Sequence, residues 1–473
     1  MAKKYDVIVI GAGTGGYPAA IRAGQLGKKV AVIERDVIGG ECLNWGCIPS
    51  KAFISAANYY HKITHGAKDM GITVDNANID MPTLVAWKDG IIKRLVGGVK
   101  QLFKANKVDI IQGSATFLNR NEVEVTPGSG KKERIEFDSA IIATGTKFIS
   151  LPGFEIDEKT ILSSKGLLAL EEIPEELICI GGGIIGLELG TAFAKLGSKV
   201  KVVELLPDLM TGVSPRMVKY VEKNLKALGV EIYKESKALG ITNEKKKLSL
   251  HIDTKTGKET LSADKILLSI GKRSVTDSLG LDKLGVKQDE RGFIIVNDQQ
   301  RTNVPNIYAV GDITGMPFLA HKATKQGILA AEVIGGLNSQ GDWVTVPSAI
   351  FTDPEIAFAG VTEEEAKKQG LDIMVSQAAW GASGRAMTAQ EDDGFVKIIA
   401  DANDNQILGY EIVGPHASDL ISEATLSLEM GATAHDVGFS IHPHPTFPEM
   451  IMEAAEAIEG RAIHIPNARK RKK

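Results

Sequence analysis

The hydrophobic positions of the chain fall into short apolar runs separated by helical stretches. Such runs occupy positions 5–10, 29–33, 138–146, 176–180, 199–203 and 306–314, and a helical stretch follows the first of them up to about Leu26. Short β-branched runs of this kind are typical of buried parallel strands. From about Val346 the pattern changes: positions 395–399 and 407–413 predict antiparallel strands around a turn at 404–405, with helices near 416–431 and 447–459.

A glycine-rich turn follows the first apolar run. Gly11, Gly13 and Gly16 have G-x-G-x-x-G spacing, and the next run ends at Glu34. The first glycine permits a tight turn, the second lets the backbone approach a pyrophosphate, and the third lets helix and strand pack closely, while the acid can bind a ribose. The helix N-terminus adds free N–H groups for the phosphates. This order predicts a dinucleotide site.

The same arrangement recurs later in the chain. Gly181, Gly183 and Gly186 follow the run at 176–180, and the run at 199–203 leads to Glu204. Two such folds imply two bound dinucleotides. Glu204 favours NAD over NADP, because a carboxylate binds a free 2′-hydroxyl and repels a 2′-phosphate. Residues 205–211 contain no arginine to hold such a phosphate.

The three cysteines of the chain are too few for a disulfide scaffold and are typical of a reducing compartment. Cys179 lies in a predicted buried strand and is expected to be inert. Cys42 and Cys47 are separated by four residues. A zinc site normally needs four nitrogen or sulfur ligands, and the nearby His61 and His65 are more typical of a helix surface. We therefore expect a reactive dithiol and no metal site.

The segment 39–51, Gly-Gly-Glu-Cys-Leu-Asn-Trp-Gly-Cys-Ile-Pro-Ser-Lys, resembles the active-site signature of the pyridine nucleotide–disulfide oxidoreductases. It is most similar to that of the lipoamide-oxidising members. The resemblance implies that Cys47 lies beside a flavin as a thiolate and that Cys42 exchanges with the substrate. Lys51 would lie near the reactive end of the flavin, where a cation stabilises negative charge and lowers a neighbouring thiol's pKa. By family order the first glycine loop holds FAD and the second holds NAD.

Further motifs resemble the same family. Gly145, in Ala-Thr-Gly, stands where the family's chain leaves the flavin domain, and Gly311 and Asp312 correspond to its ribityl and phosphate side. Ala320 belongs to the stretch that passes beneath the flavin. The resemblance pairs Glu188 with the active-site lysine.

Gly271 ends a predicted strand and is expected at the NAD site. Lys272 and Arg273 after it resemble the family's basic return segment. The family's usual Pro-Asn continuation is replaced here by Ser274-Val275, which weakens the expectation of a specific role for the two basic residues.

The C-terminal part contains the sequence His-Pro-His-Pro-Thr-Phe-Pro-Glu at 442–449. Histidine titrates near neutrality and suits proton transfer at a thiol, but the residues alone leave open whether either histidine is a base or a loop residue. In the family, His444 would be the general base, acting on the thiols of the other subunit of a homodimer. Glu449 would orient it, and His442 would give structural support. Pro448 replaces a small polar residue, and the orientation by Glu449 is retained if the proline stands in the first helical turn, where it is tolerated.

The motifs and the resemblance together predict an α/β protein with two Rossmann-like dinucleotide-binding domains and a C-terminal α+β dimerisation domain. We expect an FAD-binding domain at 1–150 and 271–345, an NAD-binding domain at 151–270 and a dimerisation domain at 346–473.

The resemblance implies an enzyme that oxidises protein-bound dihydrolipoamide to lipoamide through the Cys42–Cys47 pair and FAD, and reduces NAD to NADH. Its partner would be a lipoyl carrier of a 2-oxo acid dehydrogenase or glycine-cleavage complex. One alternative is an NAD(P)H-dependent reductase of another disulfide such as glutathione disulfide, or of a metal ion. Glu204, the His-x-His-Pro-Thr sequence and the lack of a C-terminal cysteine pair argue against it. Another alternative is a non-catalytic assembly subunit.

Composition limits the remaining possibilities. Hydrophobic residues make up 43% and charged residues 24%, as in ordinary globular proteins. The net charge of -4 does not create a strong electrostatic field that would attract nucleic acid. No apolar run is long enough to span a bilayer. The first strand pattern begins by Tyr5, which leaves no room for a cleaved signal and predicts a cytoplasmic protein without an appended N-terminal carrier domain. The basic stretch at 469–473 is expected to be a solvated end.

Overall fold

The computed structural model describes residues 3–244 and 247–468, so the basic stretch at 469–473 lies outside the described residues. The chain forms two compact units. Unit 1 consists of the residues up to 173 together with 268–342, and unit 2 consists of 174–267 together with 343–473. The domain boundaries predicted from the sequence stay predictions.

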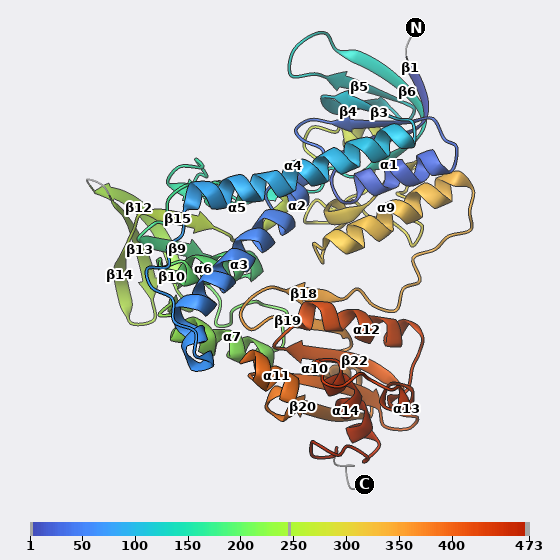
Figure 1. Ribbon diagram of the computed structural model, residues 1–473. Helices are drawn as coiled ribbons and strands as arrows, with labels where there is room; N and C mark the ends of the chain where they lie inside the picture. The colour runs from blue at the N-terminus through green and yellow to red at the C-terminus, as the bar shows by residue number, and fades with distance from the viewer. Residues whose placement is uncertain (1–2, 245–246, 469–473) are drawn as a thin grey trace. The chain divides into compact units, whose positions relative to one another are not determined.

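A seven-stranded sheet forms the centre of unit 1 (Figure 1). Its strands are β1 (Lys3–Ile10), β2 (Val30–Glu34), β3 (Val108–Gln112), β4 (Ser114–Asn119), β5 (Glu122–Thr126), β6 (Glu133–Ile142) and β17 (Ile307–Ala309). They lie in the order β3-β2-β1-β6-β5-β4, with β17 also paired to β6. The pairings β1–β2, β2–β3, β1–β6 and β17–β6 are parallel, whereas β4 and β5 form an antiparallel extension. The predicted parallel strands of the first nucleotide fold are therefore confirmed.

Some helices of unit 1 pack against strands of this sheet, and others carry the residues of the predicted dithiol. The helices of unit 1 are α1 (Gly16–Gln25), α2 (Gly40–Asn44), α3 (Cys47–His61), η1 (Lys62–Gly66), η2 (Ala67–Met70), α4 (Met81–Ala105), α5 (Ser164–Leu167), α8 (Leu281–Leu284), η3 (Gly311–Thr314) and α9 (Ala320–Gly335). Helices α1, α4 and α8 pack against strands of the sheet, and α1 and α9 run side by side (Figure 1). Gly327 permits this close approach, since a Cβ there would lie 2.1 Å from the carbonyl oxygen of Gly15.

Unit 1 also contains three short strands. The strands β7 (Thr146–Phe148) and β16 (Lys272–Ser274) pair antiparallel, with Lys272 opposite Phe148. The short strand β8 spans Ile161–Leu162.

Unit 2 contains the second nucleotide fold. Its strands and helices are β9 (Glu176–Ile180), α6 (Ile184–Lys195), β10 (Lys199–Val203), α7 (Pro215–Ala227), β11 (Glu231–Tyr233) and β15 (Lys265–Leu268). The strands lie in the order β11-β10-β9-β15, and β9–β10 and β10–β11 are parallel. A separate antiparallel sheet follows from β12 (Lys237–Glu244), β13 (Lys247–Thr254) and β14 (Gly257–Ala263).

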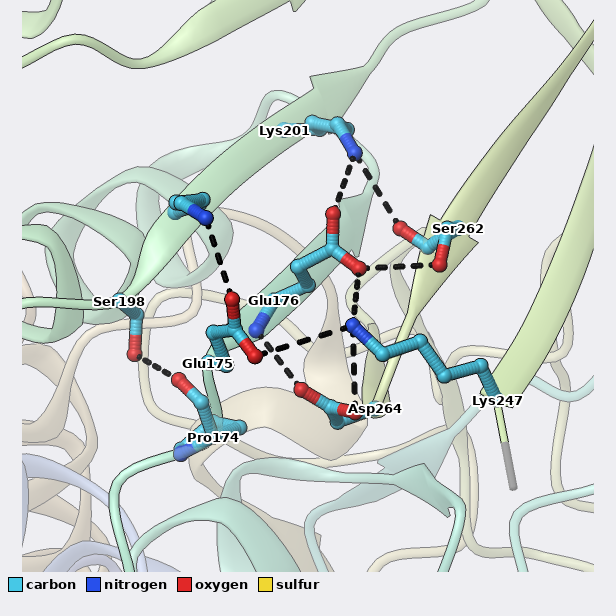
Figure 2. Close-up of polar contacts among 9 residues, drawn as sticks. Pro174, Glu175, Glu176, Ser198, Lys201, Lys247, Ser262 and Asp264 are labelled. Atoms are coloured by element: carbon cyan, nitrogen blue, oxygen red, sulfur yellow. Dashed lines mark hydrogen bonds and ion pairs between the residues drawn. The ribbon is translucent and has the colours of Figure 1, made fainter.

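A polar network around Glu176 joins these two sheets (Figure 2). One carboxylate oxygen accepts hydrogen bonds from Lys247 Nζ at 2.7 Å and Ser262 Oγ at 2.9 Å, and the other from Lys201 Nζ at 3.3 Å. The bond from Lys247, with the contacts of Ser262 and Lys201, outweighs the cost of burial and lowers the pKa of Glu176 to about 2. The network therefore ties the antiparallel sheet to β9 through an ionised carboxylate.

The remainder of unit 2 is a five-stranded antiparallel sheet with helices. Its strands are β18 (Ser348–Ile350), β19 (Ile356–Gly360), β20 (Ile373–Ala379), β21 (Phe395–Asp401) and β22 (Ile407–Val413), in the order β18-β19-β22-β21-β20. The helices are α10 (Glu363–Gln369), η4 (Trp380–Ala382), α11 (Gly384–Ala389), α12 (Ala417–Glu429), α13 (Ala434–Phe439) and α14 (Glu449–Ile458). The predicted antiparallel strands and the two long helices are confirmed. Among the described residues, no helix is both long and apolar enough to cross a bilayer.

Candidate active site

The two glycine loops have the backbone that a dinucleotide requires. Gly11 and Gly181 have positive φ values of +100° and +102°, which side chains other than glycine rarely adopt. A Cβ at Gly11 would also lie 2.4 Å from the carbonyl oxygen of Ala143. At the middle glycine of the second loop, Gly183, nothing lies within 4 Å of the Cβ position, so the backbone is open to a ligand. Both loops therefore fit a pyrophosphate.

In each nucleotide fold the second strand leads to one glutamate, and the two glutamates accept hydrogen bonds from equivalent backbone N–H groups. Glu34 accepts a hydrogen bond from the Ala12 N–H at 2.7 Å, and Glu204 accepts one from the Gly182 N–H at 2.6 Å. In each case the other carboxylate oxygen accepts from the N–H two residues further along the chain. Each acid is thus held against its own glycine loop, where a ribose hydroxyl can reach its remaining lone pairs.

The predicted dithiol stands at the junction of two helices in unit 1. Cys42 lies inside α2, and Cys47 is the first residue of α3. The segment is fixed to the first glycine loop, because the Gly39 N–H donates to the Ala12 carbonyl oxygen at 2.8 Å. Both cysteines are free thiols and are only partly exposed. The structure therefore brings the cysteines together beside the first nucleotide loop.

The surroundings of the two thiols differ and favour ionisation of one of them. A hydrogen bond from Cys42, helped by the charge of Lys51, lowers the pKa of Cys47 against the effect of burial. The same hydrogen bond and burial raise the pKa of Cys42. Lys51 stands four residues after Cys47 on α3, and that helix begins at Cys47, so its N-terminal dipole also favours a thiolate there.

Asp312, a further predicted site residue, lies in η3. Burial raises the pKa of Asp312, and the nearby lysines oppose this effect. Thr146 Oγ1 donates to its carboxylate at 3.2 Å. Lys322 lies in α9, and burial lowers the pKa of its amine; Nζ donates to the carbonyl oxygen of Gly315 at 2.7 Å. The sequence patterns had singled out Asp312 but not Thr146 or Lys322.

The remaining predicted glycine and alanine positions lie at turns. Gly145 has φ +64° just before β7, and Gly311 has φ +78° as the first residue of η3. Ala320 is the first residue of α9, which confirms that a helix opens at this stretch. Gly271, with φ +120°, lies in unit 1, where its carbonyl oxygen accepts from the Ile149 N–H at 3.2 Å. Its predicted contact with NAD stays a prediction.

The histidine segment of unit 2 forms a turn that leads into α14. His444 Nδ1 lies 2.7 Å from Oε1 of Glu449, and the other carboxylate oxygen accepts from the Thr446 N–H at 2.6 Å. Burial alone would raise the pKa of Glu449, but the Thr446 N–H and His444 outweigh it, and the pKa is lowered. Pro448 stands one residue before α14 and not in its first turn as expected, yet its φ of −59° suits the start of a helix, and the contact between Glu449 and His444 is present all the same. The side chain of His444 is 81% exposed.

An aromatic contact holds this turn in place. Phe447 is buried, and its ring meets Trp380 edge-on at 5.9 Å and His416 at 4.8 Å between ring centroids. The guanidinium of Arg385 lies 4.8 Å from the same ring. No sequence pattern had pointed to Phe447, because its partners come from three distant segments.

His442 has a different environment. Its Nε2 lies 2.8 Å from the carboxylate of Glu423, and its Nδ1 lies 2.8 Å from the carbonyl oxygen of Ser440. The hydrogen bond to Glu423 raises the pKa of His442. Both ring nitrogens are engaged within the fold, which agrees with the structural role expected from the sequence.

Glu188 lies in α6 and is only 5% exposed. Its Oε1 accepts a hydrogen bond from the Phe351 N–H at 2.8 Å. Lys51 belongs to the other unit, so the pairing of Glu188 with Lys51 stays a prediction.

The described part of the chain contains no group of three or more His, Cys, Asp or Glu side chains that could hold a metal ion. The rings of His61 and His65 stack on each other at the end of α3 and in η1. Cys179 is fully buried in β9, as expected, and burial raises its pKa to about 12.

Comparison with known proteins defines the class. Residues 5–327 match the family model of the pyridine nucleotide-disulphide oxidoreductases, and residues 346–455 match the model of their dimerisation domain. The chain therefore belongs to the pyridine nucleotide-disulphide oxidoreductase family. This confirms the predicted fold class and the predicted kind of enzyme, an oxidoreductase that uses FAD and NAD.

Individual relatives narrow the class further. The chain is 44% identical to a dihydrolipoyl dehydrogenase of Geobacillus stearothermophilus over 97% of each chain. It is 45% identical to a dihydrolipoyl dehydrogenase of Thermus scotoductus over 98% of this chain and 100% of that one. Among solved structures, LpdA of Mycobacterium tuberculosis superposes with a TM-score of 0.89 at 26% identity, covering 95% of this chain and 99% of LpdA.

Proposed function

We propose that this chain is a dihydrolipoyl dehydrogenase, which transfers two electrons from a dihydrolipoyl group to NAD through the Cys42–Cys47 pair and FAD. The observation that carries the proposal is the unequal pair of thiols, with the thiolate favoured at Cys47 beside Lys51. The near-full-length similarity to dihydrolipoyl dehydrogenases supports the choice of substrate.

The thiol steps follow from the roles of the two cysteines. In the oxidised enzyme the cysteines form a disulfide. His444 takes the proton from one substrate thiol, and the resulting thiolate attacks Cys42 Sγ, which breaks the disulfide and releases Cys47 as a thiolate. His444 passes its proton to Cys42 as that thiolate leaves and takes the proton of the second substrate thiol, whose sulfur attacks the substrate sulfur bound to Cys42, so that the substrate leaves as the cyclic disulfide. Both electrons now reside on the cysteine pair.

His444 acts in this scheme as the general base, and Glu449 orients its ring. The carboxylate at 2.7 Å from Nδ1 fixes the ring and leaves Nε2 to face a thiol. In a homodimer formed through the dimerisation domain, His444 would serve the thiols of the other subunit. Glu188 would pair with Lys51 and hold its charge beside the flavin.

Bound FAD and NAD supply the hydride chemistry that carries the two electrons from the dithiol to the nicotinamide. The first glycine loop and Glu34 would hold FAD, with Gly145, Gly311, Asp312 and Ala320 lining its site. The second loop and Glu204 would hold NAD, with Gly271 completing that site. The assigned domains are residues 1–150 with 271–345 for FAD, 151–270 for NAD and 346–473 for the dimer contact.

The partner of the enzyme would be a lipoyl carrier protein of a 2-oxo acid dehydrogenase or glycine-cleavage complex, and its location the cytoplasm. The carrier would present its dithiol to Cys42.

The decisive experiment measures NAD reduction by free dihydrolipoamide with purified, flavin-loaded protein. Reactions with NADP, and with NADPH plus glutathione disulfide, run in parallel. Rapid NADH formation from dihydrolipoamide alone supports the proposal. NADPH consumption with glutathione disulfide and no reaction with dihydrolipoamide would replace both the substrate and the nucleotide. No turnover in any reaction would favour an assembly subunit.

A further inference from the structure

An acidic residue stands directly before the first cysteine of the dithiol. Glu41 is the second residue of α2, next to Cys42, and its charge opposes formation of the Cys47 thiolate. A carboxylate near a thiolate is unfavourable because like charges repel at short range in a partly buried site. A group that neutralises Glu41 would therefore favour the Cys47 thiolate.

The structure supplies that group from a distant part of the chain. The ammonium of Lys272 forms a hydrogen-bonded ion pair with Oε1 of Glu41 across 231 positions of sequence. The pair is mostly buried, since the two side chains are 13% and 25% exposed. Lys272 belongs to β16, and its Nζ also lies 5.1 Å from the centroid of the Phe148 ring on the paired strand β7. The lysine is thus held in one place by a carboxylate and an aromatic face.

We propose that Lys272 is a positioning residue of the dithiol site, which holds Glu41 in an ion pair and thereby keeps its negative charge from suppressing the Cys47 thiolate. The inference rests on the proposed role of Cys47 as the ionised thiol. It gives a specific function to a basic position for which the sequence offered only a weak expectation.

Several other charged or titratable groups lie near the dithiol and also influence how readily the thiols ionise. Cys42 and Lys51 favour the thiolate at Cys47, as described above. The phenol of Tyr17 lies near both thiols; burial, followed by their negative charge, raises its pKa. Asp312 is influenced by both Lys272 and Glu41, with opposite signs. Cys42, Tyr17 and Asp312 bring no positive charge to Glu41, whereas Lys272 contacts its carboxylate directly in an ion pair.

The test compares Lys272→Met, Glu41→Gln and the double variant in a Cys42→Ser background. In that background Cys47 is the reactive thiol, because Cys179 is fully buried. The readout is the rate at which methyl methanethiosulfonate modifies Cys47, followed by mass spectrometry between pH 5 and 9 in the flavin-loaded protein. Methionine keeps the stem of Lys272 over Phe148 while removing the charge. The matched control is Lys147→Met on β7, which removes a lysine paired with Asp277 in an exposed ion pair.

We expect Lys272→Met to slow modification of Cys47 about fivefold at neutral pH and to move its pH profile upwards, because an uncompensated carboxylate then faces the thiolate. Adding Glu41→Gln should restore the original rate, and Lys147→Met should leave it unchanged. An unchanged rate in Lys272→Met overturns the proposal. So does a slowed rate that persists in the double variant, since that result would assign the effect to packing. The readout requires no turnover, so a different physiological substrate would not alter it.

Discussion

The contact between His444 and Glu449 yields a quantitative prediction. Replacing Glu449 with Gln keeps the size of the side chain but removes its charge. In the structure one carboxylate oxygen faces His444 Nδ1 at 2.7 Å and the other accepts from the Thr446 N–H at 2.6 Å. The amide group has only one acceptor oxygen, so its NH2 group must face one of two donors. The variant therefore loses either the orientation of the ring or the backbone contact that holds the turn.

The size of the effect follows from the kind of hydrogen bond. Hydrogen bonds to charged groups contribute about 1.5–3 kcal/mol. The side chain of His444 is 81% exposed, so water competes for the ring. We therefore expect a loss of about 1–2 kcal/mol, which corresponds to about 5- to 30-fold in kcat/KM. The pKa of Glu449 is lowered, so the carboxylate is ionised at neutral pH and the loss should be constant through that range.

The assay is NAD reduction by dihydrolipoamide between pH 6 and 9, with flavin content measured on the same samples. The matched control is Glu459→Gln at the other end of α14, where the carboxylate lies 3.4 Å from Nδ1 of His435. That variant should retain its activity. If Glu449→Gln changes kcat/KM less than twofold while its flavin content is normal, Glu449 does not orient the base and the proposed role is wrong.

Three further predictions concern other parts of the molecule. Glu176→Gln should lower the free energy of unfolding by about 1–2 kcal/mol at neutral pH, a modest value because the partner Lys247 is 42% exposed. A carboxylate with a lowered pKa stabilises the fold only while it is ionised, so the difference in stability between the parent protein and the variant should fade as the pH drops from 4.5 to about 2. A difference in melting temperature that persists at pH 2 would contradict this. Glu204→Ala should raise KM for NAD about tenfold and reduce the preference over NADP, because the acid that binds the ribose is lost. Equal KM values in parent and variant, from steady-state kinetics with both nucleotides, would remove that role. Phe447→Leu should lower kcat/KM about 3- to 10-fold with normal flavin content, because the turn that carries His444 loses its ring contacts; full activity would show that these contacts do not position the base.

The glycine turns and the start of α14 could be predicted from the sequence, because each depends only on a few neighbouring residues. The positive φ values of Gly11 and Gly181 arise from one tight turn between a strand and a helix, and such a turn demands glycine wherever it occurs. The start of α14 at Glu449 follows from Pro448, which fits the beginning of a helix and not its interior. Spacing along a few residues is therefore sufficient for these features.

Contacts between distant segments could not be predicted in the same way. The partner of Glu41 lies 231 positions away, and the residues around Phe447 come from η4, α11 and the segment before α12. Nothing in the neighbouring sequence of Lys272 indicates a carboxylate partner. Side-chain pairing of this kind depends on how the strands are arranged in the sheets, which residue spacing does not specify.

The difference in ionisation between Cys42 and Cys47 depends both on neighbouring residues and on a contact between distant segments. Cys47 begins a helix of 15 residues and has Lys51 one turn further along, so local sequence alone already favours its thiolate over that of Cys42. Glu41 works against this preference, and only the fold brings Lys272 to oppose it. A motif match therefore identifies which thiol ionises, but how readily it ionises depends on a residue outside the motif. Two proteins with identical cysteine segments should then differ in thiol reactivity whenever the position of Lys272 differs.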